Sequence, residues 1–478
     1  MSGGGGRVRP AAPCCAKGLG LSGEDAAHSE ARRRWCAREE NGGGAIDPVH
    51  RARHVVALAM ADRFDGITAL FASNLRPLAT SAMLRSAWEA AMAEIGAVLS
   101  VGEASSQEAA GGLMLVSVPV IGERENFAVL VSISEAGSLA GIQLVPSVSE
   151  DRAAWSPPAY VHPGSFTEEA VAVGSGNLAV EGALSVPKAH HPVPAVVLLS
   201  GSGPQDRDGT LGPNKPLKDL AWGLASRGVA ALRLDKVTYA HRQAMARRID
   251  TFTPTDEYVP QALAALEVLR QQAAVDPRSV FVLGHSLGGT MVPRVGAQEA
   301  DIRGLIVMAG GAVPLHWSTV RQLRYLAALT PPGAASETVH IMAEQAEHVD
   351  RPDLSGDTAP ADLPFGIPAA YWLDLRDYDP AVAAARLQKP ILLLQGGRDY
   401  QVTADDDWVV WKAGLAGSGV ATFGFHPAAD HMFFAGEGLS RPEDYLRAQH
   451  MDEVVVADVA NWVHRIAQAG SSLAVHRP

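Results

Sequence analysis

Residues 284–288 read G-H-S-L-G and directly follow the apolar run S-V-F-V-L at residues 279–283. A buried strand that enters G-x-S-x-G forms a strained turn into a helix, with glycines where a side chain would collide. Five-residue matches of this kind arise by chance in many loops, so the motif is informative only together with the segments that flank it. A β-branched strand precedes the motif and a helix-compatible segment follows it at residues 290–292. We therefore predict that Ser286 is a nucleophile held in the open.

A serine hydroxyl needs a base to take its proton, and the base needs an acid to orient it. In one known arrangement of such a triad along the chain, the acid follows the serine in sequence and the histidine comes last. The strand expected at residues 391–394 leads into Q-G-G-R-D, which places Asp399 in a loop at the strand's carboxyl end. The strand expected at residues 421–425 leads to His426 and His431. His431 lies farther into its loop and precedes an apolar segment, so it is the predicted base, with Asp399 as the acid.

Other carboxylates compete with Asp399 for the role of the acid. Asp430 is adjacent in sequence to the predicted base, so its side chain should diverge from the imidazole. Asp206 and Asp235 are further candidates, and Asp235 follows an earlier strand where it could hold a loop through a salt bridge. The run D-D-D at residues 405–407 fits the first turn of a helix, where negative charge is favoured.

An oxyanion hole needs backbone N–H groups aimed at the developing negative charge. Leu287, the residue after the nucleophile, is predicted to supply one of them. The other should come from the loop S-G-S-G-P at residues 200–204, which follows the strand expected at 195–199. Taken alone, this loop is just as readily a flexible turn. Its position after that strand favours a functional role, with Ser202 as the donor.

The bulk composition excludes several classes of function. A chain of 478 residues that is 47% hydrophobic can bury a sizeable core, and two domains are expected. The net charge of −12 and the lack of a long basic run argue against nucleic acid as a partner. No apolar stretch approaches the roughly 20 residues that span a bilayer. The three cysteines, Cys14, Cys15 and Cys36, all precede residue 47, and no histidine spacing supports a zinc site.

Residues 1–46 are predicted to be a disordered leader. They contain many glycines and arginines and no continuous apolar h-region, so they do not form a recognisable secretory signal. A cytoplasmic protein is therefore expected. Ordered patterning begins only near His50, so a start codon called too early is an alternative, and export stays open in that case.

Residues 47–146 are predicted to form a small α+β domain without a cluster of catalytic residue types. Helical spacing of apolar residues and short strand-like runs between turns support this interpretation. The expected helices are 47–71 and 81–99, and the expected strands are 113–120, 127–133 and 139–145. Residues 147–165, rich in proline, serine and alanine, read as a linker.

Residues 166–470 alternate apolar strands with helices, which predicts a mostly parallel sheet covered on both faces. The expected strands are 170–173, 178–186, 195–199, 229–234, 280–283, 305–309, 391–394 and 421–425. The expected helices are 217–225, 258–272, 287–297, 403–415 and 452–467.

A long aromatic segment at about residues 313–387 interrupts this rhythm and is predicted to be a helical cap over the substrate. Trp317, Tyr371 and Trp372 are the predicted substrate-binding residues, although aromatic residues of this kind often only pack a core.

Several longer motifs resemble a group of bacterial α/β-hydrolase carboxylesterases. They are L-S-G-S-G-P-Q-D-R-D-G at 199–209, G-H-S-L-G-G at 284–289, Y-W-L-D-L at 371–375, L-Q-G-G-R-D-Y-Q-V at 394–402 and D-H at 430–431. The resemblance covers roughly residues 47–467. It implies an α/β-hydrolase fold preceded by a small nuclear-transport-factor-like domain of unknown function. It also implies Ser286 as nucleophile, Asp399 as acid and His431 as base.

The expected function is that of a serine carboxylic-ester hydrolase, which acts on small to medium acyl esters through an acyl-enzyme. No metal or organic cofactor is required by this chemistry, and the expected partner is the small-molecule ester. A thioesterase, an amidase or an acyltransferase with the same site is an alternative, and a hydrolase-fold binding protein without catalysis is a weaker one. Self-association as a homo-oligomer stays open.

Overall fold

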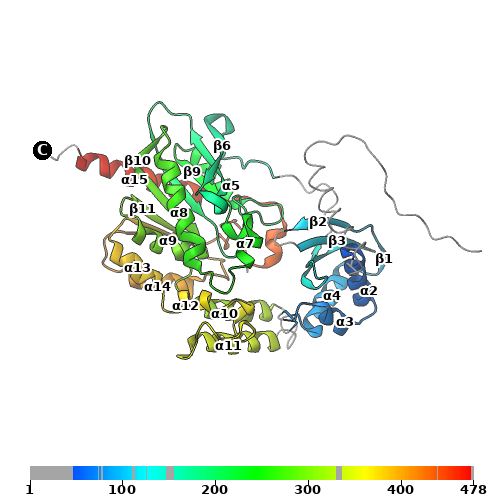
Figure 1. Cartoon of the computed structure of the whole chain (residues 1–478). Helices are drawn as coiled ribbons and strands as arrows, with labels where there is room; N and C mark the ends of the chain where they lie inside the picture. The colour runs from blue at the N-terminus through cyan, green and yellow to red at the C-terminus, as the bar shows by residue number, and fades with distance from the viewer. Residues whose placement is uncertain are drawn as a thin grey trace, which may run out of the picture.

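In the computed structural model, the described residues are 47–474 apart from 74, 77–78, 110–112, 125, 147–154, 330–335 and 439. The predicted leader at residues 1–46, with its three cysteines, lies outside the described residues, as does the first half of the predicted linker. Figure 1 shows a smaller unit, coloured blue to cyan, beside a larger body that runs from green to red.

The smaller unit is a layer of helices packed on an antiparallel sheet in the strand order β1-β3-β4-β5, with β2 paired to β3. Its core contains side chains from both layers, among them Val55, Trp88 and Val118. Its elements are α2 Pro48–Met60, α3 Phe64–Leu70, α4 Ser81–Ile95, β1 Val98–Val101, β2 Ser105–Ala109, β3 Leu113–Gly122, β4 Asn126–Ile133 and β5 Leu139–Pro146. The likeness of this unit to a nuclear-transport-factor-like domain stays a prediction.

The smaller unit differs from its sequence prediction at three places. The single helix expected at 47–71 is two helices, separated at Asp62, whose φ is 59°. The helix expected to reach residue 99 ends at Ile95, because Gly96 adopts a φ of 77° that favours glycine and ends the helix. The strands β1 and β2 were not predicted, since both are short and neither alternates clearly between apolar and polar residues.

The larger body is built on an eight-stranded sheet in the order β13-β12-β11-β10-β8-β9-β7-β6. All neighbouring strands are parallel except those that involve β7, which is antiparallel to both β6 and β9. The strands are β6 Phe166–Val173, β7 Val180–Pro187, β8 Val193–Leu199, β9 Ala230–Leu234, β10 Val275–His285, β11 Gly304–Met308, β12 Ile391–Gly396 and β13 Ala421–His426. The predicted mostly parallel α/β sheet is confirmed.

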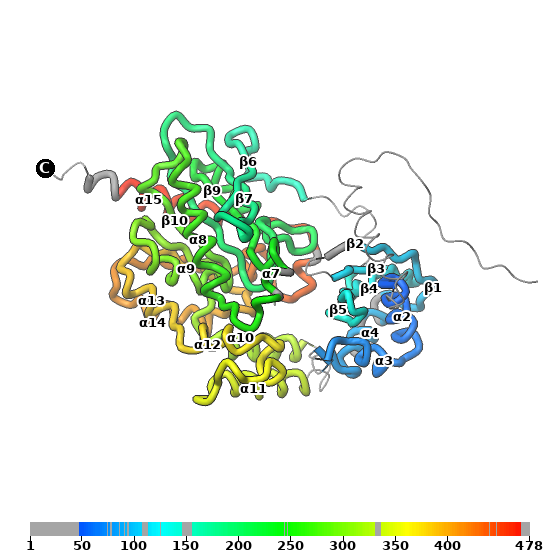
Figure 2. The backbone as a smooth tube through the Cα atoms, in the orientation of Figure 1, coloured from blue at the N-terminus to red at the C-terminus, as the bar shows by residue number. Residues whose placement is uncertain are grey.

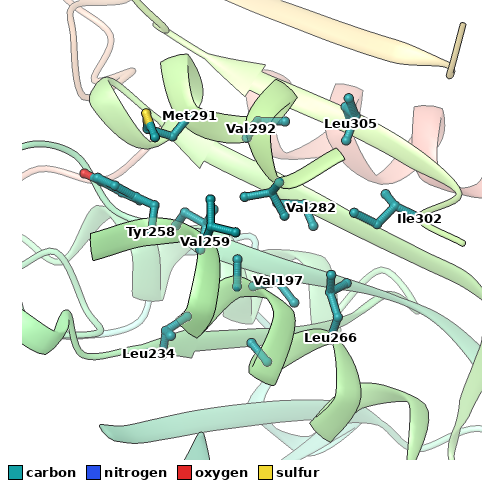
Figure 3. Close-up of a cluster of buried hydrophobic side chains, with 14 of the residues drawn as sticks. Val197, Leu234, Tyr258, Val259, Leu266, Val282, Met291, Val292, Ile302 and Leu305 are labelled. Atoms are coloured by element: carbon teal, nitrogen blue, oxygen red, sulfur yellow. The ribbon is translucent and has the colours of Figure 1, made fainter. Parts of the chain in front are cut away.

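Two hydrophobic cores lie on the two faces of this sheet. Successive residues of β8 alternate between them: Val197 belongs to the core under α8 and α9, and Val196 to the core under α5 and α15. Figure 3 shows the first core, where Tyr258 and Val259 of α8 and Met291 of α9 pack over the strands. The helices of the body outside the cap are α5 Pro216–Ala225, α6 Val237–Ala240, α7 Arg242–Ala246, α8 Pro254–Arg270, α9 Leu287–Gln298, α14 Val409–Gly414 and α15 Glu453–Ala474.

Residues 155–165, the described half of the expected linker, pack on the larger body. The hydroxyl of Tyr160 donates to the carbonyl oxygen of Met451 at 2.9 Å, and the indole of Trp155 donates to Asp219 Oδ1 at 2.8 Å. Tyr160 and Val161 belong to the core that also contains residues of α5 and α15. Residues 155–165 are therefore packed as part of the larger body.

The segment expected to form a cap is helical. Its helices are α10 Leu315–Ala328, α11 Ser336–Asp350, α12 Ala369–Arg376 and α13 Pro380–Leu387, with short 3₁₀ turns η3 Pro360–Asp362 and η4 Pro364–Gly366. In Figure 2, α10 and α11 (yellow) lie at the edge of the body that faces the smaller unit. There Thr338 of α11 contacts Met83 of α4, with 2.8 Å between its hydroxyl and the sulfur. The last helix of this segment, α13, packs against α9. Its Ala381 and Ala384 belong to the core under α8 and α9.

Across the described part of the chain, no helix combines the length and apolar character needed to cross a membrane.

Candidate active site

Ser286 lies between the end of β10 and the start of α9, in a sharply turned backbone with φ 56° and ψ −125°. A non-glycine residue in this region is strained, at a cost of about 1–3 kcal/mol. Its neighbours show why glycines surround it. A Cβ on Gly284 would lie 2.2 Å from the carbonyl oxygen of Gly288, and a Cβ on Gly288 would lie 2.5 Å from that of Ser200. Only glycine therefore fits at positions 284 and 288, where the turn packs against its own backbone and against the backbone after β8.

The structure brings the three predicted triad residues together. His431 Nε2 lies 3.1 Å from Ser286 Oγ, and His431 Nδ1 lies 2.8 Å from Asp399 Oδ2. The side chains of His431 and Asp399 are almost fully buried, whereas Ser286 is half-buried. Because the imidazole hydrogen-bonds to a carboxylate at Nδ1, its other nitrogen is free to accept a proton from the serine hydroxyl.

The carboxylate of Asp399 is held by the loop in which it lies. Its Oδ1 accepts hydrogen bonds from the amides of Gln401 at 2.8 Å and Val402 at 2.9 Å, which leaves Oδ2 for the imidazole. The loop thus fixes the orientation of this carboxylate.

The competing acids near the histidine have structural contacts instead. Asp430 points into its own loop, where Oδ1 accepts from the amides of Met432 at 2.9 Å and Phe434 at 3.0 Å. Burial raises the pKa of Asp430 to about 6. His426, the other histidine considered, lies 3.5 Å from Asp458. Neither Asp430, the competing acid, nor His426, the competing base, forms a hydrogen bond with Ser286.

Asp206 and Asp235 hold the loop that follows β8. Asp206 accepts from the amide of Thr210 at 2.9 Å and from its hydroxyl at 2.6 Å. Asp235 accepts from the amide of Arg207 at 2.7 Å, and the Arg207 guanidinium lies 3.4 Å from the same oxygen. The loop-holding salt bridge expected of Asp235 is present.

The acidic run at residues 405–407 lies in a π-helical turn, η5 Ala404–Trp408, which precedes α14. Asp407 is fully buried and connects the start of the cap to the loop after Asp399. Its Oδ1 accepts from the amides of Ala312 and Val313, and its Oδ2 forms a salt bridge of 2.7 Å with Arg321 of α10. The sequence pattern of this run predicted only the first turn of a helix, and the contact of Asp407 with Arg321 was not predicted.

His285 is a second residue that sequence reasoning missed, although it occupies the variable position before the serine. Its side chain is buried, and Nε2 lies 2.8 Å from the backbone carbonyl oxygen of His431. Burial, together with the neighbouring His431, lowers the pKa of His285 to about 3. A neutral imidazole with a proton on Nε2 can donate this hydrogen bond. The only available signal was a histidine inside the motif itself.

The loop predicted to complete an oxyanion hole lies against the nucleophile. A Cβ on Gly201 would meet the Cβ of Ser286 at 3.1 Å. Ser202 and Leu287 line the same cavity as Ser286. The amide of Ser202 has no hydrogen-bond partner within the part of the chain that the structure describes. Both predicted donor residues therefore lie at the wall of the cavity that Ser286 also lines.

A cavity of about 300 Å³ opens beside Ser286, between the carboxyl ends of the strands and the cap. Tyr371 and Trp372 line it, as does Phe365. Trp317, the third predicted substrate-binding residue, is not among its lining residues and donates its indole N–H to Asp350 at 2.7 Å within the cap. No Asp, Glu, Lys, Arg or His among the described residues lines this cavity.

No cluster of three or more His, Cys, Asp or Glu side chains within the described ranges is arranged to hold a metal ion.

Comparisons with known proteins agree with the fold. Residues 196–448, more than half of the chain, match the alpha/beta hydrolase family. The chain is 35% identical over 343 residues to Esterase EstD of Thermotoga maritima, covering 71% of this chain and 77% of that protein.

Among solved structures, Est1E from Butyrivibrio proteoclasticus is 17% identical, with a TM-score of 0.42, over 63% of this chain and 99% of that one. The acylaminoacyl peptidase of Pyrococcus horikoshii is 13% identical, with a TM-score of 0.38, over 68% of this chain and 51% of that one. The family match and the similarity to EstD together show that this chain belongs to the α/β-hydrolase family.

Proposed function

We propose that the protein hydrolyses carboxylic esters through a Ser286–His431–Asp399 triad and an acyl-enzyme intermediate. The observation that supports this proposal is the continuous hydrogen-bonded chain from Ser286 Oγ to His431 Nε2 and from His431 Nδ1 to Asp399 Oδ2, at 3.1 and 2.8 Å. Chains of this geometry activate a serine hydroxyl in unrelated hydrolases.

In this mechanism Ser286 Oγ attacks the carbonyl carbon of the ester while His431 Nε2 takes the hydroxyl proton. The carbonyl oxygen becomes an oxyanion, which the amides of Ser202 and Leu287 stabilise. Collapse of the tetrahedral intermediate breaks the ester C–O bond, and the departing alcohol takes the proton from His431. A water molecule then attacks the acyl-enzyme with the same proton transfers, which releases the acid and restores Ser286.

The cavity supports small to medium uncharged acyl groups as substrates. Its volume of about 300 Å³ lies at the lower end of the range for small-molecule sites. Its lining is aromatic, aliphatic and neutral polar, and Tyr371 and Tyr378 at its wall have pKa values raised by burial, so their phenols stay neutral. A charged acyl group would lose its hydration without gaining an opposite charge.

The alternatives within the same chemistry are a thioesterase, an amidase and an acyltransferase. Similarity to a protein called an esterase favours oxygen esters over these. A binding protein without catalysis would not need a base hydrogen-bonded to the serine hydroxyl.

A panel of p-nitrophenyl esters with graded acyl length, with matched acyl-thioesters and anilides, tests the proposed function on the purified protein. We expect turnover of short to medium esters above that of the thioesters and anilides. A fluorophosphonate probe should label the parent protein and not Ser286→Ala. Ser355→Ala, which removes an exposed hydroxyl, is the matched control and should react as the parent does. A parent protein that neither turns over esters nor takes up the probe would contradict the proposal.

A further inference from the structure

The loop that carries Ser202 is fastened to the end of the neighbouring strand, β9. Two backbone contacts attach its far half: the amide of Arg207 donates to Asp235 Oδ1 at 2.7 Å, and the amide of Lys236 donates to the carbonyl oxygen of Gln205 at 3.1 Å. The residues that follow β9 therefore run alongside the loop and bring the side chain of Lys236 beneath it.

Two buried side chains converge on one carbonyl group at the near half of the loop. Lys236 Nζ donates to the carbonyl oxygen of Gly201 at 2.8 Å, and the hydroxyl of Tyr258, from α8, donates to the same oxygen at 2.7 Å. Lys236 Nζ also lies 3.0 Å from the Tyr258 hydroxyl. The exposed fractions of Lys236 and Tyr258 are 6% and 3%, so both donor side chains are almost fully buried.

The third donor position of the ammonium group is also occupied. Glu257 Oε2 lies 3.1 Å from Lys236 Nζ, and its other oxygen accepts from the hydroxyl of Thr238 at 2.6 Å. The three N–H groups of Lys236 thus match three acceptors: a carbonyl, a phenol and a carboxylate. Burial lowers the pKa of Lys236, and the adjacent Glu257 opposes this shift. The cluster is compensated in charge and saturated in hydrogen bonds.

The Gly201 carbonyl and the Ser202 amide belong to the same peptide unit. Because a trans peptide is planar, its C=O and N–H point in opposite directions. A carbonyl held on the buried side by two donors therefore aims the N–H toward the cavity, where Ser202 lies with Ser286. Two donors on the carbonyl also polarise the peptide, which strengthens its N–H as a donor.

We propose that Lys236 and Tyr258 are positioning residues that orient the Ser202 amide toward the oxyanion formed at Ser286. This inference rests on the proposed function. It identifies the buried Lys236–Glu257 pair as part of the apparatus for transition-state stabilisation, although neither side chain touches the substrate.

Tyr258→Phe is the sharper test, because it removes one hydroxyl and leaves the ring in the core. We expect kcat for a short ester to fall about 10-fold with little change in KM, since the oxyanion exists only after attack. The affinity of a trifluoromethyl ketone, which forms a tetrahedral adduct with the serine, should fall by a similar factor. Tyr239→Phe is the matched control, because that ring is 37% exposed and its hydroxyl lies outside the cluster.

A second variant removes the cation without leaving an unpaired buried charge. Lys236→Met combined with Glu257→Gln should fold and should lower kcat more than Tyr258→Phe does, on the order of 10²-fold, because the stronger of the two anchors is gone. Circular dichroism and thermal unfolding establish that each variant is folded.

The inference is overturned if folded Tyr258→Phe and the double variant lose thermal stability but keep the parent's kcat and trifluoromethyl ketone affinity. That outcome would give the cluster a structural role alone. Failure of the proposed function would be seen separately, as a parent protein without ester turnover and without fluorophosphonate labelling at Ser286.

Discussion

The imidazole of His285 and the backbone of His431 are joined by a hydrogen bond of 2.8 Å between Nε2 and the carbonyl oxygen. The residue that precedes the proposed nucleophile therefore holds the residue proposed as its base. The two rings lie 4.8 Å apart between centroids. This contact connects the end of β10 to the loop after β13, which are far apart in the sequence.

The contact predicts that His285→Leu lowers kcat by about 10-fold while the fold is retained, because His431 is then no longer held at a fixed distance from Ser286. His285→Gln should restore much of the activity, since its amide can donate to the same carbonyl. The measurement is kcat and KM for a short ester with circular dichroism of each variant. Equal activity of the leucine variant and the parent would show that the His431 loop needs no such support.

The identity of the acid predicts a large difference between two isosteric substitutions. Asp399→Asn should lower kcat by roughly 10⁴-fold, because an amide cannot stabilise the imidazolium and favours the wrong tautomer. Asp430→Asn should change kcat far less, since Asn can still accept from the amides of Met432 and Phe434. His426→Ala should likewise be mild. If Asp430→Asn were the crippling change in ester turnover, Asp430 would be the acid.

Asp430 also predicts a pH dependence of stability. Burial raises its pKa in the folded state to about 6, above its ordinary value of 3.8. The folded state therefore binds the proton more tightly, and the stability from this group is present below pH 3.8 and is lost as the pH rises through 6. A shift of this size corresponds to about 3 kcal/mol.

Asp430→Asn removes this titration, so we expect the variant's Tm relative to the parent to be higher at pH 8 than at pH 4.5. Thermal unfolding of both proteins at the two pH values measures the difference. A relative Tm that does not change with pH, or that changes in the opposite direction, would contradict the burial-raised pKa.

The packing of residues 155–165 predicts where the smaller unit can be removed. A chain that begins at Trp155 keeps the bonds from Trp155 to Asp219 and from Tyr160 to Met451, and should be labelled at Ser286 by a fluorophosphonate. A chain that begins at Pro163 loses both bonds and the burial of Tyr160, and should be less stable by at least about 2 kcal/mol.

Denaturant unfolding and probe labelling compare the two truncated chains with the full protein. Loss of labelling in a folded chain that begins at Trp155 would mean that the smaller unit completes the site, for which the contact of Met83 with Thr338 would be the first place to look.

The turn around Ser286 could be predicted from sequence because everything that determines it lies within about ten residues. An apolar strand, two close glycines and a helix-forming segment are local features, and local sterics decide the outcome. The same holds for the strand ends that carry Asp399 and His431, since carboxyl ends of parallel strands meet at one edge of a sheet. The strands β1 and β2 of the smaller unit were missed because short strands without clear alternation owe their pairing to neighbours.

The tertiary structure decided which side chains share a contact at long range. Lys236 reaches the carbonyl of Gly201 across 35 residues, and His285 reaches that of His431 across 146. Likewise, Tyr371 lines the cavity whereas Trp317 binds within the cap, although both are aromatic residues of the same segment. Such contacts depend on how strands and helices are placed relative to one another, and residue type and spacing along the chain do not specify that placement.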